Sequence, residues 1–133
     1  WNVSNVIVMS HMFHNASSFN QNLSRWDINN VKTMNNMFKG ATNFDCNWNQ
    51  RILTDANVAE AVKLWFIDKW RCRFIYGDMS LWDTSRVTNM SYLFFDKERF
   101  NEDLSKWNVS NVRGMAHMFY KSSAFNCDLS QWE

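Results

Sequence analysis

One unit of 25 residues recurs along this sequence and restricts its possible folds more than any other feature. The tryptophans that open the units are spaced by 25, 56, 25 and 25 residues, and the long interval is one unit of 25 plus an insert of 31. The units occupy residues 1–25, 26–50, 82–106 and 107–131, and the tryptophans are Trp1, Trp26, Trp82, Trp107 and Trp132. Such a period predicts that each unit buries the same face against its neighbour.

Equivalent apolar positions of the four units define the expected structural core. The core columns are Trp26, Trp82 and Trp107; Val6, Val31, Val87 and Val112; Met9, Met34, Met90 and Met115; Phe13, Phe38, Phe94 and Phe119; and Phe19, Phe44, Phe100 and Phe125. Two further columns are Met12, Met37, Leu93 and Met118, and Leu23, Trp48, Leu104 and Leu129. The polar columns between them vary in residue type, which is typical of exposed positions.

Within a unit, the spacing of apolar residues indicates two short elements. Val6, Met9, Met12 and Phe13 recur at helical spacing, which predicts a short α- or 3₁₀-helix. Residues 23–28 alternate between apolar and polar, which predicts a short strand. Stacked units would pair these strands in parallel, about 4.8 Å apart. We expect a repeat solenoid with one helical capping insert.

The insert divides the chain into three parts. These are two N-terminal coils at 1–50, a helical insert or cap at 51–78, and two further coils with the start of a third at 79–133. The repeat pattern is lost at Arg51, and residues 53–66 are typical of an amphipathic helix with Thr54 or Asp55 as its N-cap. Met79 to Trp82 is expected to resume the strand. We expect the helix to cover the start of the second array.

The unit Trp-Asn-Val-Ser-Asn-Val-x-x-Met-x-x-Met-Phe-x-x-Ala/Ser-x-x-Phe-Asn-x-x-Leu-Ser resembles the repeat of BspA-like surface proteins. Residues 1–25 and 107–131 are the most similar, and residues 26–50 depart at Asp45-Cys46-Asn47-Trp48. The segment Leu53-Thr54-Asp55 with its following helix is similar to the segment that leads into such arrays. The resemblance implies a leucine-rich-repeat-like solenoid, display on the cell surface or secretion, and adhesion or protein binding.

Several functional classes have no support in the sequence. No Ser-His-Asp order, Gly-rich phosphate loop or nucleophile motif is present, so we expect neither an enzyme nor a cofactor. His11 and His14 lie three residues apart, but no carboxylate or cysteine completes a metal site. The basic and aromatic cluster at 69–74 stands between Asp68 and Asp78, and the net charge is only +1, so no nucleic-acid partner is expected. No apolar run is long enough to cross a membrane.

The three cysteines are expected to remain free thiols. Cys46 and Cys127 share a polar column and are expected to be exposed. If the arrays stack continuously, two coil steps separate them by about 9–10 Å, more than the roughly 4.4–6.8 Å between Cα atoms that a disulfide allows. Cys72 is expected to be buried as a small apolar residue.

The leading functional hypothesis is a non-catalytic scaffold for protein–protein interaction or adhesion, within a larger surface protein. Two polar columns that vary give a candidate interaction surface. One contains His11, Asn36, Tyr92 and His117, and the other contains Gln21 and Glu102 together with Cys46 and Cys127. The partner would be a protein. Two alternatives are a structural spacer or stalk without a ligand, and a carbohydrate-binding surface, which would require exposed tryptophans. No targeting signal is present, and five Asn-x-Ser sites favour an extracellular location.

Overall fold

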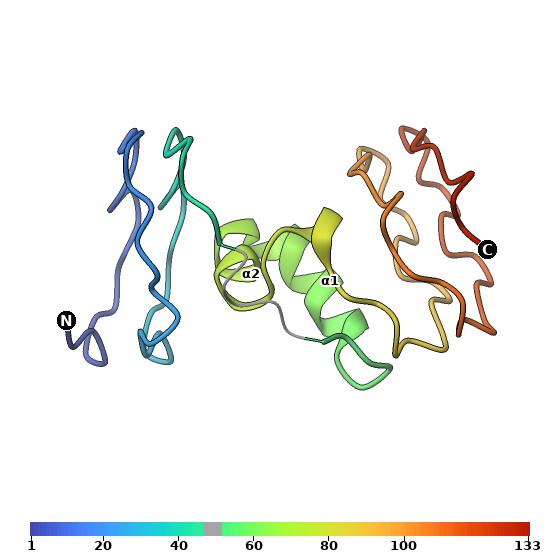
Figure 1. Cartoon of the computed structure of the whole chain (residues 1–133), viewed down its shortest axis with the longest axis horizontal. Helices are drawn as coiled ribbons and strands as arrows, with labels where there is room; N and C mark the ends of the chain where they lie inside the picture. The colour runs from blue at the N-terminus through green and yellow to red at the C-terminus, as the bar shows by residue number, and fades with distance from the viewer. Residues whose placement is uncertain (47–51) are drawn as a thin grey trace.

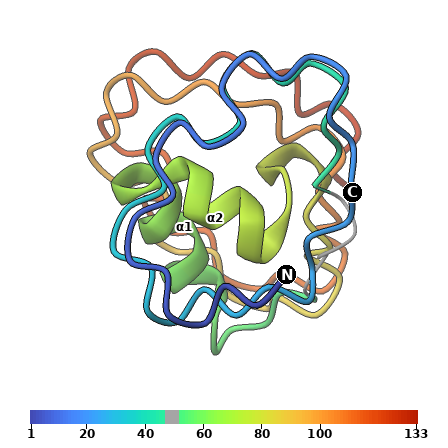
Figure 2. The same ribbon diagram turned by 90° about the vertical axis from the view of Figure 1, so that its left-hand side faces the viewer.

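The repeat units and the insert follow one another along the longest axis of the molecule. The computed structural model describes residues 1–46 and 52–133. Unit 1 (residues 1–25) and the described part of unit 2 (residues 26–46 of 26–50) lie at one end, the helices in the middle, and units 3 and 4 (residues 82–106 and 107–131) at the other end (Figure 1). Viewed end-on, the units trace similar outlines, within which the helices lie in projection (Figure 2). Trp48, expected in the core column of Leu23, and Arg51, where the repeat pattern is lost, lie outside the described residues.

Each unit is a succession of tight turns, and units 1 and 3 also direct a row of amides to the unit that follows them. Within unit 1, the amide of Met12 donates to the Met9 carbonyl at 3.3 Å and that of Ala16 to the Phe13 carbonyl at 3.1 Å. Between units 1 and 2, four amides at alternate positions donate to four carbonyls, from Met9, His11, Phe13 and Asn15 to Thr33, Asn35, Met37 and Lys39. Units 3 and 4 repeat this pattern, from Met90, Tyr92, Phe94 and Asp96 to Gly114, Ala116, Met118 and Tyr120.

The expectation of a strand-based, leucine-rich-repeat-like solenoid is wrong. Across residues 1–46 and 52–133 there is no sheet, and the parallel pairing is limited to isolated bridges: Val8 with Thr33, Thr54 with Arg86, and Asn89 with Gly114. Residues 23–28 contain a turn instead of a strand. Residues 6–13 do not form a helix, because a helix directs every amide along its own axis. Here alternate amides point to the next unit, and His11 has a φ of 61°.

Equivalent aromatic rings of neighbouring units lie over one another. The ring centroids of Phe13 and Phe38 are 5.5 Å apart, as are those of Phe94 and Phe119, and Trp82 lies 6.0 Å from Trp107. In units 2 and 3, beside the helices, the core columns are mostly buried, at Val31, Met34, Phe38, Trp82, Val87, Met90, Phe94 and Phe100, and so are Met9 and Trp107. The partly buried members are Val6, Phe13, Phe19, Trp26, Phe44, Val112, Phe119 and Phe125, whereas Met115 is exposed.

The insert folds into two helices rather than one. Helix α1 spans Val58–Ile67 and helix α2 spans Lys69–Tyr76. Asp68 interrupts the helix with a ψ of 84°, and its side chain then caps α2 by accepting from the Arg71 amide at 3.0 Å. Gly77 ends α2 with a φ of 79°, which glycine adopts without steric cost. The 3₁₀ helix η2, Met79–Leu81, follows where a strand was expected.

The expected helix start is also displaced. The N-cap of α1 is Asn57, and its side-chain oxygen accepts a hydrogen bond from the Thr54 amide at 2.8 Å. The carboxylate of Asp55 instead reaches unit 3, where it accepts from the amides of Thr88 at 2.8 Å and Asn89 at 3.1 Å. The Thr88 hydroxyl also donates to this carboxylate, and this bond, followed by those from the two amides, lowers the pKa of Asp55. Asp55 therefore supplies acceptors to amides of the first C-terminal unit.

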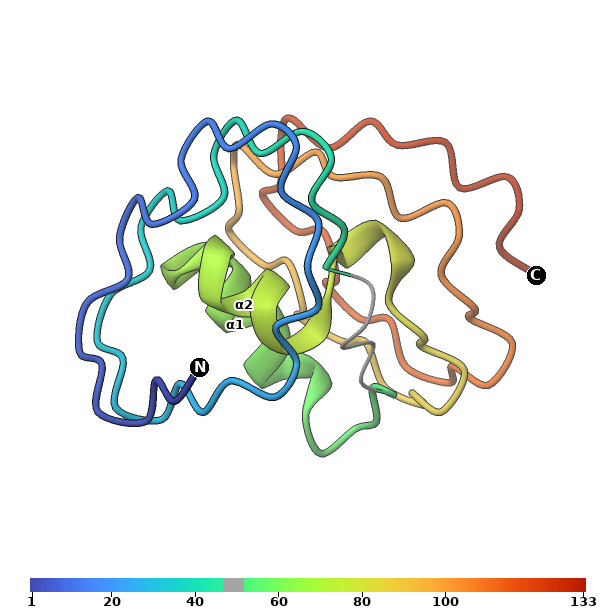
Figure 3. The ribbon, with the colours of Figure 1, turned by 60° about the vertical axis from the view of Figure 1, so that its left-hand side comes forward.

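The two helices cross over between the two pairs of units. Helix α1 follows the N-terminal units in sequence, but its Ala61, Val62 and Trp65 belong to the core of units 3 and 4. Helix α2 precedes the C-terminal units, but its Phe74 and Trp70 pack in the core of units 1 and 2. The Arg71 guanidinium also donates a hydrogen bond to the Val31 carbonyl. Both helices therefore lie between the pairs and connect two separate hydrophobic cores (Figure 3).

The helices are too short to span a bilayer. Among the described residues, no helix is both long and apolar enough to cross a membrane.

Candidate functional site

The variable column singled out in the sequence lies in the left-handed region of the backbone. The φ angles are 61° at His11, 54° at Asn36, 63° at Tyr92 and 53° at His117. Asparagine and histidine are enriched among residues with positive φ, whereas a bulky residue such as tyrosine is uncommon there. His11, Tyr92 and His117 are exposed, and Asn36 is half-buried.

A second exposed column, three residues further on, completes the site in units 3 and 4. It contains His14, Lys39, Phe95 and Tyr120, which the sequence analysis did not identify. The sequence signal that could have identified this column is its change from His and Lys in units 1 and 2 to aromatic residues in units 3 and 4. Tyr92, Phe95 and Tyr120 are 57%, 39% and 49% exposed.

The exposed rings support one another as a continuous cluster. The ring of Tyr92 lies 5.2 Å from His117 and 5.8 Å from Phe95. Tyr120 lies 5.2 Å from Phe95 and 5.6 Å from His117. We call Tyr92, Phe95, His117 and Tyr120 the aromatic ladder. Because each ring contacts two others, the cluster presents aromatic surface to solvent with little freedom left to lose on binding.

The equivalent surface of units 1 and 2 is polar. The His11 ring lies 5.6 Å from His14, and Asn36 Nδ2 is 3.3 Å from His11 Nε2. Lys39 takes the fourth position. Within residues 1–46 and 52–133, no group of three His, Cys, Asp or Glu residues is arranged to hold a metal ion. At the same repeat positions, the surface is therefore polar in units 1 and 2 and aromatic in units 3 and 4.

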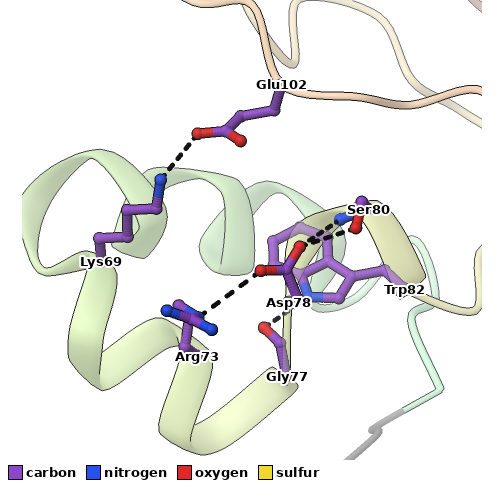
Figure 4. Close-up of polar contacts among 7 residues, drawn as sticks. All are labelled: Lys69, Arg73, Gly77, Asp78, Ser80, Trp82 and Glu102. Atoms are coloured by element: carbon purple, nitrogen blue, oxygen red, sulfur yellow. Dashed lines mark hydrogen bonds and ion pairs between the residues drawn. The ribbon is translucent and has the colours of Figure 1, made fainter. Parts of the chain in front are cut away.

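The second candidate column does not join the aromatic ladder. Gln21 is exposed, whereas Glu102 is half-buried and its carboxylate pairs with the Lys69 ammonium of α2 at 2.8 Å (Figure 4). Glu102 and Cys127 line a polar hollow of about 490 Å³ that contains none of the ladder residues. The exposure expected for Cys46 is wrong, because α2 places Arg73 against its thiol and leaves Cys46 only 3% exposed.

The basic cluster of α2 has partners inside the protein. Lys69 pairs with Glu102, and Arg73 lies 3.6 Å from the Asp78 carboxylate. Asp78 also accepts from the Ser80 amide at 3.1 Å, and the Trp82 indole donates to the Gly77 carbonyl at 3.2 Å (Figure 4). These contacts fix the chain between α2 and unit 3, so the cluster has a structural role.

Burial of Cys72 predicts a loss of stability at alkaline pH. All three cysteines are free, and burial raises the pKa of the Cys72 thiol from 9.0 to about 12. The folded protein holds this proton more tightly than the unfolded chain does. The contribution of Cys72 is therefore complete below pH 9 and is lost as the pH rises toward 12.

Urea unfolding over this pH range would measure the effect. Replacing Cys72 with alanine is expected to flatten the fall in the free energy of unfolding. Cys127→Ala, at a half-exposed position, is the matched control and is expected to keep the slope of the unchanged protein. An equal slope in the Cys72→Ala variant would show that this buried thiol is not responsible.

A comparison with protein families identifies a related family. A family model described as a Mycoplasma protein of unknown function, DUF285, matches residues 1–65 and residues 70–133. The first segment contains units 1 and 2 with most of α1, and the second contains most of α2 with units 3 and 4. No curated protein and no solved structure matches the chain.

Proposed function

Because the chain belongs to the DUF285 family, whose function is unknown, we propose a function from the geometry of its surface. The chain is a non-catalytic scaffold that binds a protein partner through the aromatic ladder. The observation that carries this proposal is the exposure of Tyr92, Phe95 and Tyr120 side by side on one face. Clustered exposed aromatic side chains mark interaction sites on soluble proteins.

The chemistry of the ladder favours a protein partner. Tyrosine is enriched among the residues that dominate binding energy at protein interfaces, because it combines a large apolar ring with a polar hydroxyl. Lys121 Nζ lies 5.8 Å from the Tyr120 ring and adds a cation at the edge of the ladder. A nucleic-acid partner has less support, since the net charge is +1 and the cations of α2 are paired.

Two observations bear on the setting and on the alternatives. The BspA-like resemblance supports a surface or secreted protein, and the asparagines of all five Asn-x-Ser sites are exposed: Asn2, Asn15, Asn22, Asn89 and Asn108. Carbohydrate binding through the repeat tryptophans is disfavoured, because Trp82 and Trp107 are buried. A spacer without a ligand is the remaining alternative, and it predicts that the aromatic ladder binds nothing.

A peptide-display selection on the immobilised chain would test this proposal. We expect enriched peptides to bind the Tyr92→Asn/His117→Asn variant at least about tenfold more weakly, since aromatic anchors contribute about 2 kcal/mol or more at interfaces. Asparagine occupies the same column at Asn36 with a φ of 54°, so the substitution removes the rings and suits the backbone.

His11→Asn is the matched control, because it makes the same change in the same column of unit 1. Peptides that bind this variant and the unchanged chain equally, but not the double variant, would support the ladder. Enriched peptides that bind all three proteins equally would place binding elsewhere, and a selection without enrichment would favour the spacer.

A further inference from the structure

A hollow beside helix α1 continues the aromatic ladder toward the insert. It has a volume of about 240 Å³, and Tyr92 lines it as well as belonging to the ladder. Its lining comes from two elements, with Val62 and Lys63 on α1 and Ser91, Tyr92, Leu93 and Lys97 in unit 3. We call it the α1 hollow. Because pockets for drug-sized ligands measure about 300–1,000 Å³, this volume suits a single side chain of a larger partner.

The charged groups that line the α1 hollow are both cations. Lys63 is exposed, and Lys97 is half-buried with its Nζ atom 4.7 Å from the centre of the Phe66 ring. This contact with α1 holds the Lys97 ammonium in place. Glu60 lies one turn before Lys63 but does not line the hollow, and across residues 1–46 and 52–133 no ion pair includes either lysine. Two ammonium groups without a carboxylate partner favour an anionic group here.

The rest of the lining suits the other parts of an acidic side chain. Val62 and Leu93 are buried and give the hollow an apolar floor. The Ser91 hydroxyl accepts a hydrogen bond from the Ala116 amide at 3.2 Å, and no group in the described part of the chain accepts the hydrogen of this hydroxyl. A hydroxyl can donate one hydrogen bond while it accepts another. The α1 hollow therefore offers apolar contact for a methylene stem, with a hydroxyl donor and two cations for a carboxylate.

A larger hollow that also includes Lys97 has no such preference for one charge. It measures about 620 Å³ and is lined by residues of both helices and of unit 3. Its cations are Lys69, Lys97 and Arg99, and its anions are Asp96, Glu98 and Glu102. Lys69 and Glu102 already pair at 2.8 Å. Because both signs are present in equal number, the larger hollow selects neither, and the α1 hollow is the better candidate for a charged ligand group.

We propose that the α1 hollow and the aromatic ladder together bind an acidic segment of the protein partner. A carboxylate of the segment enters the hollow, and its neighbouring apolar side chains cover the ladder. Tyr92 joins the two surfaces, and Lys121 Nζ adds a third cation 5.8 Å from the Tyr120 ring. This inference rests on the protein-binding function proposed above and specifies the chemistry of the partner.

The peptides selected on the immobilised chain would test this inference. We expect them to be enriched in aspartate and glutamate relative to the starting library. Replacing the acidic residue of a selected peptide with its amide counterpart is expected to weaken binding to the unchanged chain about fivefold, the upper range for an exposed ion pair. The same replacement is expected to have no effect on the Lys63→Gln/Lys97→Gln variant, which lacks both ammonium groups. Added salt should weaken the unchanged chain more than this variant.

Lys32→Gln/Lys106→Gln is the matched control, because it removes two charges at exposed positions that do not line the α1 hollow. It is expected to bind the selected peptides as the unchanged chain does, and circular dichroism would establish that all variants are folded. Equal binding of the acidic peptides to the two lysine variants would overturn the inference. Selected peptides without acidic residues would also overturn it.

The failure of this inference and that of the protein-binding function are distinguishable. Peptides that lose affinity for the Tyr92→Asn/His117→Asn variant, but show no difference between the two lysine variants, would overturn the acidic preference and leave the aromatic ladder as a protein-binding surface. Peptides that bind the Tyr92→Asn/His117→Asn variant and the unchanged chain equally would overturn both proposals, because the acidic segment is then not held at the ladder.

Discussion

Replacing Phe94 with alanine is expected to lower the free energy of unfolding by about 3–5 kcal/mol, the range for truncating a buried phenylalanine. Phe94 is fully buried, and its ring lies 4.1 Å from Phe100, 5.5 Å from Phe119 and 6.5 Å from Phe66 of α1. It therefore has neighbours in its own unit, in unit 4 and in the insert. Alanine would leave a cavity that these fixed groups cannot fill. Urea denaturation followed by tryptophan fluorescence would measure the change.

Phe13→Ala is the matched control, because Phe13 occupies the same column in unit 1. Its ring lies 3.9 Å from Phe19 and 5.5 Å from Phe38 of the following unit, and it is only partly buried. We expect its loss to cost about half as much as the loss of Phe94, or less. Equal costs for the two variants would show that the position of a unit beside the helices does not determine its packing.

The second large effect is expected from Phe74→Ala in α2. Phe74 is 3% exposed and belongs to the core of units 1 and 2, so truncation is expected to cost about 3–5 kcal/mol. Because units 3 and 4 have a separate core, the loss should fall mainly on residues 1–46. Hydrogen exchange would detect it as faster exchange in units 1 and 2, with units 3 and 4 largely unchanged.

Trp65→Ala in α1 provides the reciprocal variant. Trp65 is buried in the core of units 3 and 4, where its ring meets Trp82 at 6.0 Å. Its loss is expected to accelerate exchange in residues 79–133 before residues 1–46. Uniform acceleration along the whole chain in both variants would contradict the division into two cores, and would indicate that the insert unites them into one cooperative unit.

The pairing of equivalent residues could be predicted from the sequence, but the backbone conformation could not. A fixed period states that Phe13 corresponds to Phe38, and their rings are indeed stacked. The same period does not state which way each amide points. The spacing of Met9, Met12 and Phe13 is compatible with a helix, and the alternate amides that bond to unit 2 exclude one.

Contacts between distant segments explain the other differences. Cys46 belongs to a repeat column that is otherwise mostly polar, so the sequence indicated an exposed position. It is buried because Arg73 of α2 packs against it. The break between α1 and α2 occurs at Asp68, whose side chain accepts a hydrogen bond from the Arg71 amide and so caps the second helix. The aromatic ladder was partly visible through Tyr92 and His117. Phe95 and Tyr120 were not, because exposed aromatic residues resemble core residues in a sequence.

The crossover of the two helices also dictates an order of events during synthesis on the ribosome. Chains fold from their N-terminus as they emerge, yet units 1 and 2 cannot complete their core until Phe74 has left the exit tunnel. The later half has no such delay, because α1 is already present when its first unit appears. In the nascent chain, the part that is made first is therefore the part that must wait.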